Sequence, residues 1–286
     1  MRFESNFNED AMINRLARNE RRRPTDENPV IREAHRKALE TLGSDSINPE
    51  EFTEVYGEQS VQKDLELVAK LESKFEKNDT TALTAEVLEA IIYEQAELSD
   101  WLGHNVTTIN TSRFDDIVNG VDLVARFNDK EVDSYLALGV DVTFGKKAIQ
   151  LKMEKIMKQI EDDTLTSIKY FESDGKKGPL KHIPRVVIGL ERNTVNQLAK
   201  LWLDAKKQEL GKHHARLMLL NQMQTELETF LAFAQRKNSQ RSIHSLENAL
   251  HTIRETIEAQ GEDNPDIPED RVNEAILEQL AIFENR

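Results

Sequence analysis

The sequence predicts an α/β (α+β) protein in which a mixed sheet is embedded in long helices at both ends of the chain. Residues 118–127 and 134–144 alternate between apolar and polar side chains, as two neighbouring strands do. Residues 184–190, PRVVIGL, form a continuously apolar run that is typical of a strand buried on both faces. Elsewhere, strong helix formers carry apolar residues at spacings of three and four.

The N-terminal part predicts a polar arm followed by two helical stretches. Residues 1–48 form the arm, with short helices over 10–22 and 29–42, and Asn48-Pro49 opens a long helical stretch. The next helix is predicted over 85–102, with Thr84 as its N-cap and Gly103 at its end. Glu94 lies within the apolar stripe of this helix, so it is expected either at the margin of the stripe or held by a partner. The stripe consists of Val87, Ile91, Leu98 and Trp101.

The centre of the chain carries two carboxylates inside apolar strands. Because side chains alternate between faces, Asp122 points away from the apolar face of the first strand, and Asp141 and Thr143 point away from that of the second. Burying a carboxylate lowers the folding stability by roughly several kcal/mol unless a partner pairs with it. A metal ion between Asp122 and Asp141 is one such partner. The apolar faces consist of Val121, Leu123, Ala125 and Phe127, and of Leu136, Leu138, Val140, Val142 and Phe144.

The C-terminal part predicts an α/β unit and then a helical region. A helix over 146–161, a strand over 166–173, a basic loop GKKGPLKHI, the strand 184–190 and a helix to about 208 follow one another. From His213 onward the chain is helical. Its heptad-like seam predicts a helical hairpin or, alternatively, a homodimer contact. The seam is formed by Ile243, Leu246, Leu250, Ile253 and Ile257. The expected segments are 1–48, 49–210 and 211–286.

Composition excludes several classes of function. The 286 residues include no cysteine, which excludes disulfides, thiolate zinc sites and cysteine nucleophiles. We expect a cytoplasmic protein, because no signal peptide or membrane span is visible. The net charge of −14 argues against generic binding to nucleic acid. Residues 145–216 nevertheless carry 16 Lys and Arg against 9 Asp and Glu, which fits either a phosphate-binding face or ordinary solvated helices.

The order of these parts resembles the restriction-endonuclease-like, or PD-(D/E)XK, nuclease superfamily. NGVDLVA resembles its first motif with Asp122, and GVDVTF resembles its second with Asp141. Glu94 corresponds to the glutamate that the first core helix often supplies. The likeness covers roughly residues 85–190. It implies a Mg²⁺ or Mn²⁺ cofactor held by Glu94, Asp122 and Asp141, and hydrolysis of phosphodiester bonds in DNA or RNA.

The sequence departs from this superfamily at Thr143, where the second motif has lysine. A lysine would lower the pKa of the attacking water through its charge, whereas threonine only forms hydrogen bonds. Lys152, near the buried stripe of the next helix, or Lys146 or Lys147 at its start, is a possible replacement. Two alternatives remain: a site that uses metal ions alone, and an inactive nuclease fold retained to bind protein or nucleic acid.

Other candidate residues carry weaker signals. Asp115 is expected to shape a turn. Asp116 either shapes the same turn or adds a ligand to the metal site expected at Asp122 and Asp141. His213 and His214 are expected to be solvated, since adjacent residues on a helix point in different directions. His104 is expected in a surface loop. The sequence contains no nucleotide-binding glycine loop and no serine-hydrolase elbow.

Overall fold

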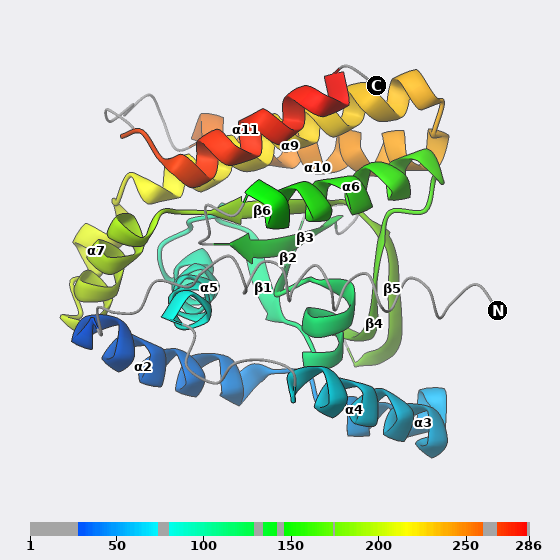
Figure 1. Ribbon diagram of the computed structural model, residues 1–286, viewed down its shortest axis with the longest axis horizontal. Helices are drawn as coiled ribbons and strands as arrows, with labels where there is room; N and C mark the ends of the chain where they lie inside the picture. Colours follow the sequence, from blue (N-terminus) through cyan, green and yellow to red (C-terminus); the bar gives the residue numbers. More distant parts are fainter. Residues whose placement is uncertain are drawn as a thin grey trace.

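The computed structural model describes residues 28–73, 80–128, 134–141, 146–173, 175–259 and 268–284. They form a mixed helix-and-sheet protein, as the sequence predicts. In Figure 1 the C-terminal helices lie above a central sheet, and α5 and α2 lie below it. The N-terminal elements are α2 (Pro29–Asp45), η1 (Pro49–Phe52), α3 (Thr53–Tyr56), α4 (Glu58–Glu72) and α5 (Thr80–Leu98).

The central sheet has four strands in the order β1-β2-β3-β6. The first three strands form an antiparallel meander, and β6 pairs parallel with β3. Helix α6 and an antiparallel hairpin of β4 and β5 lie between β3 and β6 in the sequence. A parallel pair requires such a crossover connection. The elements are β1 (Val106–Asn110), η2 (Asp115–Asn119), β2 (Leu123–Phe127), β3 (Ser134–Asp141), α6 (Lys146–Glu161), β4 (Thr166–Ser173), β5 (Lys176–Ile183) and β6 (Arg185–Gly189).

The C-terminal helices cover the sheet and confirm the predicted helical hairpin. Helix α10 packs along α9, and Leu246, Leu250 and Ile253 of the predicted seam are buried within the chain. None of the described helices has the length and apolar character needed to cross a membrane. The helices are α7 (Arg192–Leu203), α8 (Lys207–Gly211), α9 (Ala215–Lys237), α10 (Gln240–Ala259) and α11 (Arg271–Glu284).

One large apolar core connects the sheet to helices from both ends of the described chain. It extends from Ile31 of α2 to Phe283 of α11, so the three predicted segments share it. Leu123 of β2 and Leu136 of β3 face this core together, as predicted. Val121 was predicted on the same face, but it packs in a smaller cluster on the other side of the sheet, because it precedes the strand and its period of two.

Several predicted boundaries are wrong. Residues 118 and 119 belong to the π-helix η2, and the predicted basic loop GKKGPLKHI is largely strand β5. Helix α5 begins at Thr80, so Thr84 is inside it rather than at its cap. Leu98, predicted on the buried stripe, is 60% exposed. Strand β1 had not been predicted, and the predicted helix over 10–22 lies outside the described residues.

Two side chains of α9 cover the outer edge of β6. The Gln222 amide accepts a hydrogen bond from Gly189 N at 3.0 Å and donates one to Gly189 O at 2.9 Å, as a further strand would. One turn later, the Glu226 carboxyl accepts a hydrogen bond from Val187 N at 2.8 Å. Burial raises the pKa of Glu226 well above its ordinary value. The helix therefore closes an edge that would otherwise leave backbone groups unpaired.

Replacing Gln222 with leucine is expected to lower the free energy of unfolding by roughly 2–4 kcal/mol, because a buried N–H and a buried C=O of Gly189 both lose their partner. Urea denaturation followed by circular dichroism measures the change. Gln235→Leu on the exposed face of the same helix is the matched control, with an expected change within about 0.5 kcal/mol. Equal effects of the two substitutions would contradict the edge-covering role.

Candidate functional site

The site is built around Asp122, which lies directly before β2. Thr111, just after β1, holds the backbone there: its N–H donates to Asp122 O at 3.3 Å and its hydroxyl to Val121 O at 2.7 Å. Asp122 is half-buried. The carboxylate therefore projects from a fixed point at the end of the sheet.

Asp141 ends β3 at the same end of the sheet. Leu123 pairs with Leu138 in the antiparallel ladder, so Asp122, directly before Leu123, and Asp141, three residues after Leu138, lie at the same end of these two strands. The Asp141 side chain and residue Thr143 lie outside what the structure describes.

Glu89 of α5 brings a further carboxyl to this end of the sheet. Loss of hydration raises its pKa well above the ordinary value, and the negative charges of Asp122, Asp116 and Glu86 raise it further. The positive charge of Arg113 opposes this rise. Glu89 is thus a titratable group that combines lost hydration with neighbouring negative charge, the kind of group that is common at functional sites.

Arg113 is the cation that balances part of this charge. It forms an ion pair with Asp116 and another with Glu72 of α4, where Nε and Oε1 are 2.6 Å apart. The nearby Glu86 is paired with His35 of α2 at 2.6 Å. Around Glu89, several carboxylates therefore compete for few cations.

The π-helix η2 positions Asp116, and Asp115 fixes η2 to the β4–β5 hairpin. The Asp115 carboxylate accepts hydrogen bonds from the backbone N of Lys169 at 2.8 Å and of Tyr170 at 3.0 Å. It also accepts bonds from Ser112 Oγ at 2.8 Å and Asn119 Nδ2 at 2.6 Å. Burial raises the pKa of Asp115, and these bonds oppose that rise. Asp115 is a structural anchor, as its predicted turn-shaping role implied, and π-helices occur often at functional sites.

Replacing Asp115 with alanine is expected to lower the free energy of unfolding by roughly 2–4 kcal/mol, because two backbone N–H groups of β4 lose their acceptor. Urea denaturation measures the loss. Asp162→Ala, at an exposed turn, is the control and is expected to change stability by less than about 0.5 kcal/mol. A loss no larger than that of the control would show that Asp115 does not anchor η2.

The structure does not bring Glu94 to this cluster. Its carboxylate accepts a hydrogen bond from Trp202 Nε1 of α7 at 3.0 Å. Burial lowers the pKa of Lys37 on α2, and the negative charge of Glu94 opposes that shift. Glu94 lies five residues after Glu89, which turns it by about 140° around α5. The partner that the sequence required for Glu94 is therefore Trp202, and Glu89 faces Asp122 instead.

Lysines of α6 flank the cluster. The side chain of Lys155, which the sequence reasoning missed, reaches Asn119 O at 3.4 Å, and Arg185 donates to the same oxygen at 2.7 Å. Lys152 is half-buried and lies one turn before Lys155. Gly120 closes η2 with φ +68°, and a Cβ there would meet Arg185 Nη1 at 3.3 Å, so glycine is required. The side chains of Lys146 and Lys147 lie outside the described part.

The predicted histidine candidates are not part of this cluster. His213 and His214 are half-buried rather than solvated, with ring centroids 4.2 Å apart, and burial lowers the pKa of His213 to about 4. His104 is in a surface loop as expected, paired with Asp100 at 2.8 Å.

The arrangement supplies oxygen ligands, which Mg²⁺ and Mn²⁺ prefer. Within the described residues, however, no three His, Asp or Glu side chains lie close enough to hold a metal ion as they stand. The structure shows a cluster of mutually repelling carboxylates at one end of the sheet. Strand β3 ends at Asp141 at the same end. No protein-family model, no curated protein and no solved structure matches this chain.

Proposed function

We propose that the protein is a metal-dependent nuclease that hydrolyses phosphodiester bonds in nucleic acid, with a core similar to that of the restriction-endonuclease-like superfamily. One observation carries the proposal: the pKa of Glu89, on the helix before the sheet, is raised first by lost hydration and then by the negative charge of Asp122, directly before β2. Asp141 ends β3 at the same end of the same sheet. The order of helix, meander, crossover helix and parallel strand supports this comparison.

The donor set fits a divalent cation. Asp122, Asp141 and Glu89 would hold it, and Asp116 would contribute negative charge from η2. Repulsion among these groups is relieved by a proton or a cation, and the raised pKa of Glu89 reflects that repulsion together with lost hydration. When bound, a divalent ion lowers the pKa of a water molecule and offsets negative charge on the phosphoryl group.

The residues of the chain then divide the remaining work of hydrolysis. The water oxygen forms a bond to phosphorus, the bond from phosphorus to the leaving oxygen breaks, the water loses a proton and the leaving oxygen gains one. Glu89 takes the place among the metal ligands that was predicted for Glu94. Lys155, whose Nζ lies 3.4 Å from Asn119 O at the end of η2, joins Lys152 as a candidate for the positive charge that Thr143 does not supply.

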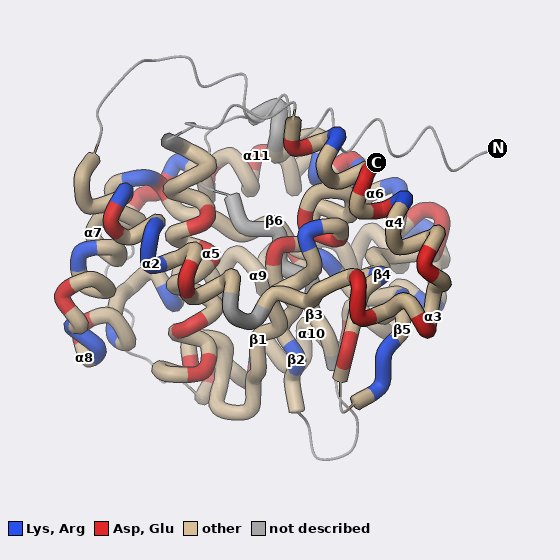
Figure 2. The backbone as a smooth tube through the Cα atoms, turned by 90° about the horizontal axis from the view of Figure 1, so that it is seen from below, with Lys and Arg blue, Asp and Glu red and all other residues tan. Residues whose placement is uncertain are grey.

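The hairpin of β4 and β5 is suited to guide the nucleic-acid backbone. Lys176 and Lys181 of β5 are exposed, and Figure 2 shows Lys positions along β5. Asp115 fastens this hairpin to η2, which also presents Asp116. A basic strand therefore adjoins the carboxylates, although the whole chain is acidic.

Incubation of the purified protein with labelled DNA and RNA, with Mg²⁺ or Mn²⁺ and with a chelator, tests the proposal. Cleavage that requires the metal and stops with the chelator is expected. Absence of cleavage of single-stranded and double-stranded DNA and RNA with both metals would exclude the nuclease.

Thr143 at the lysine position favours a second candidate, an inactive nuclease fold that binds protein or nucleic acid. Calorimetric titration with Mg²⁺ separates the two. A catalytic site binds the metal and loses that binding in Asp122→Asn, whereas a purely structural cluster does not bind it.

A further inference from the structure

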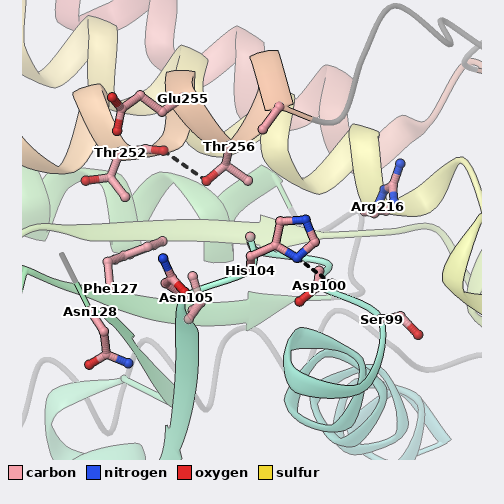
Figure 3. Close-up of a pocket in the computed structure, with 13 residues that line it drawn as sticks. Ser99, Asp100, His104, Asn105, Phe127, Asn128, Arg216, Thr252, Glu255 and Thr256 are labelled. Atoms are coloured by element: carbon pink, nitrogen blue, oxygen red, sulfur yellow. Dashed lines mark hydrogen bonds and ion pairs between the residues drawn. The ribbon is translucent and has the colours of Figure 1, made fainter. Parts of the chain in front are cut away.

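A cavity lies at the opposite end of the sheet from Asp122. It has a volume of about 420 Å³, within the range of small-molecule sites. The loop after α5, the start of β1, the end of β2, α10 and the first turn of α9 enclose it (Figure 3). Its polar lining includes Arg216, Glu255, Asn105, Asn128, Asp100 and His104.

Arg216 supplies a positive charge to this cavity that no described residue balances. It forms no ion pair with the described acidic residues, and its buried Nε has no hydrogen-bond partner among them. It also lies in the first turn of α9, which contains no acidic residue. A cation at the positive end of a helix is unfavourable, so an anion bound to the guanidinium would relieve that interaction.

The walls of the cavity are fixed before any ligand binds. Asn128 N donates to Asn105 O at 2.9 Å and so joins β1 to β2. The Thr256 hydroxyl of α10 donates to Thr252 O at 2.9 Å within the helix (Figure 3) and lies 3.3 Å from Leu102 O, so α10 packs directly on the loop after α5. Gly103 has φ +116°, and a Cβ there would approach Thr256 Oγ1 to 3.0 Å. A preformed site loses little conformational entropy on binding.

The opposite side of the cavity carries Glu255, whose carboxylate also pairs with His251 at 3.3 Å, and amide side chains that donate and accept hydrogen bonds. In Figure 3, Arg216 lies on one side, and Glu255 of α10 and Asn128 lie on the other. Asp100 is occupied by His104, at 2.8 Å. A ligand that matches both sides has an anionic group at one end and hydroxyl groups at the other.

We propose that this cavity binds a small polyhydroxylated oxyanion, with its phosphate or carboxylate on Arg216 and its hydroxyl groups on Glu255, Asn105 and Asn128. The class includes sugar phosphates and sugar acids. This site is separate from the carboxylate cluster, and its occupancy does not depend on the nuclease proposal.

Calorimetric titration of the full chain with ribose 5-phosphate and with gluconate, in a chelator that removes divalent metals, tests the site. Saturable binding of either probe is expected, with Kd of about 1 mM or tighter. The preferred probe shows whether the oxyanion is a phosphate or a carboxylate. Failure of both probes to bind would overturn the proposal.

Arg216→Gln is expected to weaken the binding at least tenfold, about 1.4 kcal/mol, and Glu255→Gln to weaken it less. Arg254→Gln is the matched control, since Arg254 is on α10, pairs with Glu228 and does not line the cavity. Asp122→Asn is expected to leave this binding unchanged, which separates it from the proposed nuclease site. Unchanged affinity in Arg216→Gln would also overturn the assignment.

Discussion

Replacing Asp122 with asparagine is expected to lower metal-dependent cleavage about 10²–10³-fold, the usual cost of removing one electrostatic contact to a transition state. The amide keeps the size of the side chain but loses the charge that a divalent cation requires. Asp122 also faces the cluster from a backbone that Thr111 holds in place, so the substitution changes charge rather than position. Cleavage rates at saturating Mg²⁺, together with calorimetric titration of the metal, measure both losses.

Asp162→Asn is the matched control for this experiment. Asp162 is exposed at the turn after α6, so its charge is removed far from the cluster, and full activity is expected. Near-normal circular dichroism of Asp122→Asn must accompany the loss of activity. Cleavage at the wild-type rate in Asp122→Asn would remove this residue from the catalytic site.

The sequence predicts the two neighbouring strands of this site, β2 and β3, because strands have a period of two. The same period is the basis for expecting Asp122 and Asp141 on a common face, which stays a prediction because Asp122 precedes β2 and the Asp141 side chain is outside the described part. The buried strand β6 and helix α6 were likewise found from uninterrupted or regularly spaced apolar residues. These patterns are local, and they fail where an element ends, as at Val121 before β2 and at Leu98 at the end of α5.

Glu89 could not be predicted from its spacing in the sequence, because α5 is buried on several sides. It packs against α2, α7, β1 and β3, so apolar residues surround the helix and a single stripe does not identify the core face. Glu94 fell on the stripe that was chosen, yet its side chain bonds Trp202. Glu89 can be identified only from the position of Asp122 in space, and the spacing of apolar residues along a helix does not give that position.

Strands β1 and β5 were not predicted from the sequence for a different reason. Residues 106–110 form a short run of β-branched side chains with little alternation of polarity, and β5 carries exposed lysines together with Gly178 and Pro179. Both strands lie at an edge of their sheet, where one side of the backbone is unpaired and polar residues are tolerated. The π-helix η2 has no comparable sequence pattern and depends on the long-range bonds of Asp115.

Replacing Glu89 with glutamine is expected to abolish metal binding and cleavage and, at the same time, to stabilise the metal-free protein by roughly 1–3 kcal/mol at neutral pH. Glutamine is nearly isosteric but carries no charge, so the repulsion from Asp122 and Asp116 disappears. For a chain of this size the gain corresponds to a rise in Tm of about 2–4 °C per kcal/mol. Thermal unfolding with a chelator measures it, and Glu97→Gln, on the exposed end of the same helix, is the control with no expected change.

The effect of Glu89→Gln on stability is expected to depend on pH, in a direction set by the raised pKa of Glu89. The pKa of Glu89 is raised on folding, so its folded carboxyl binds a proton more tightly than the unfolded one. The stability that accompanies the neutral form is present below the ordinary pKa of glutamate and is lost as pH rises through the raised pKa. The advantage of Glu89→Gln should therefore grow with pH above the ordinary value, and metal binding to the wild type should release a proton. A structural glutamate held by partners would show the opposite result, since glutamine would then destabilise the fold at every pH at which the carboxylate is charged.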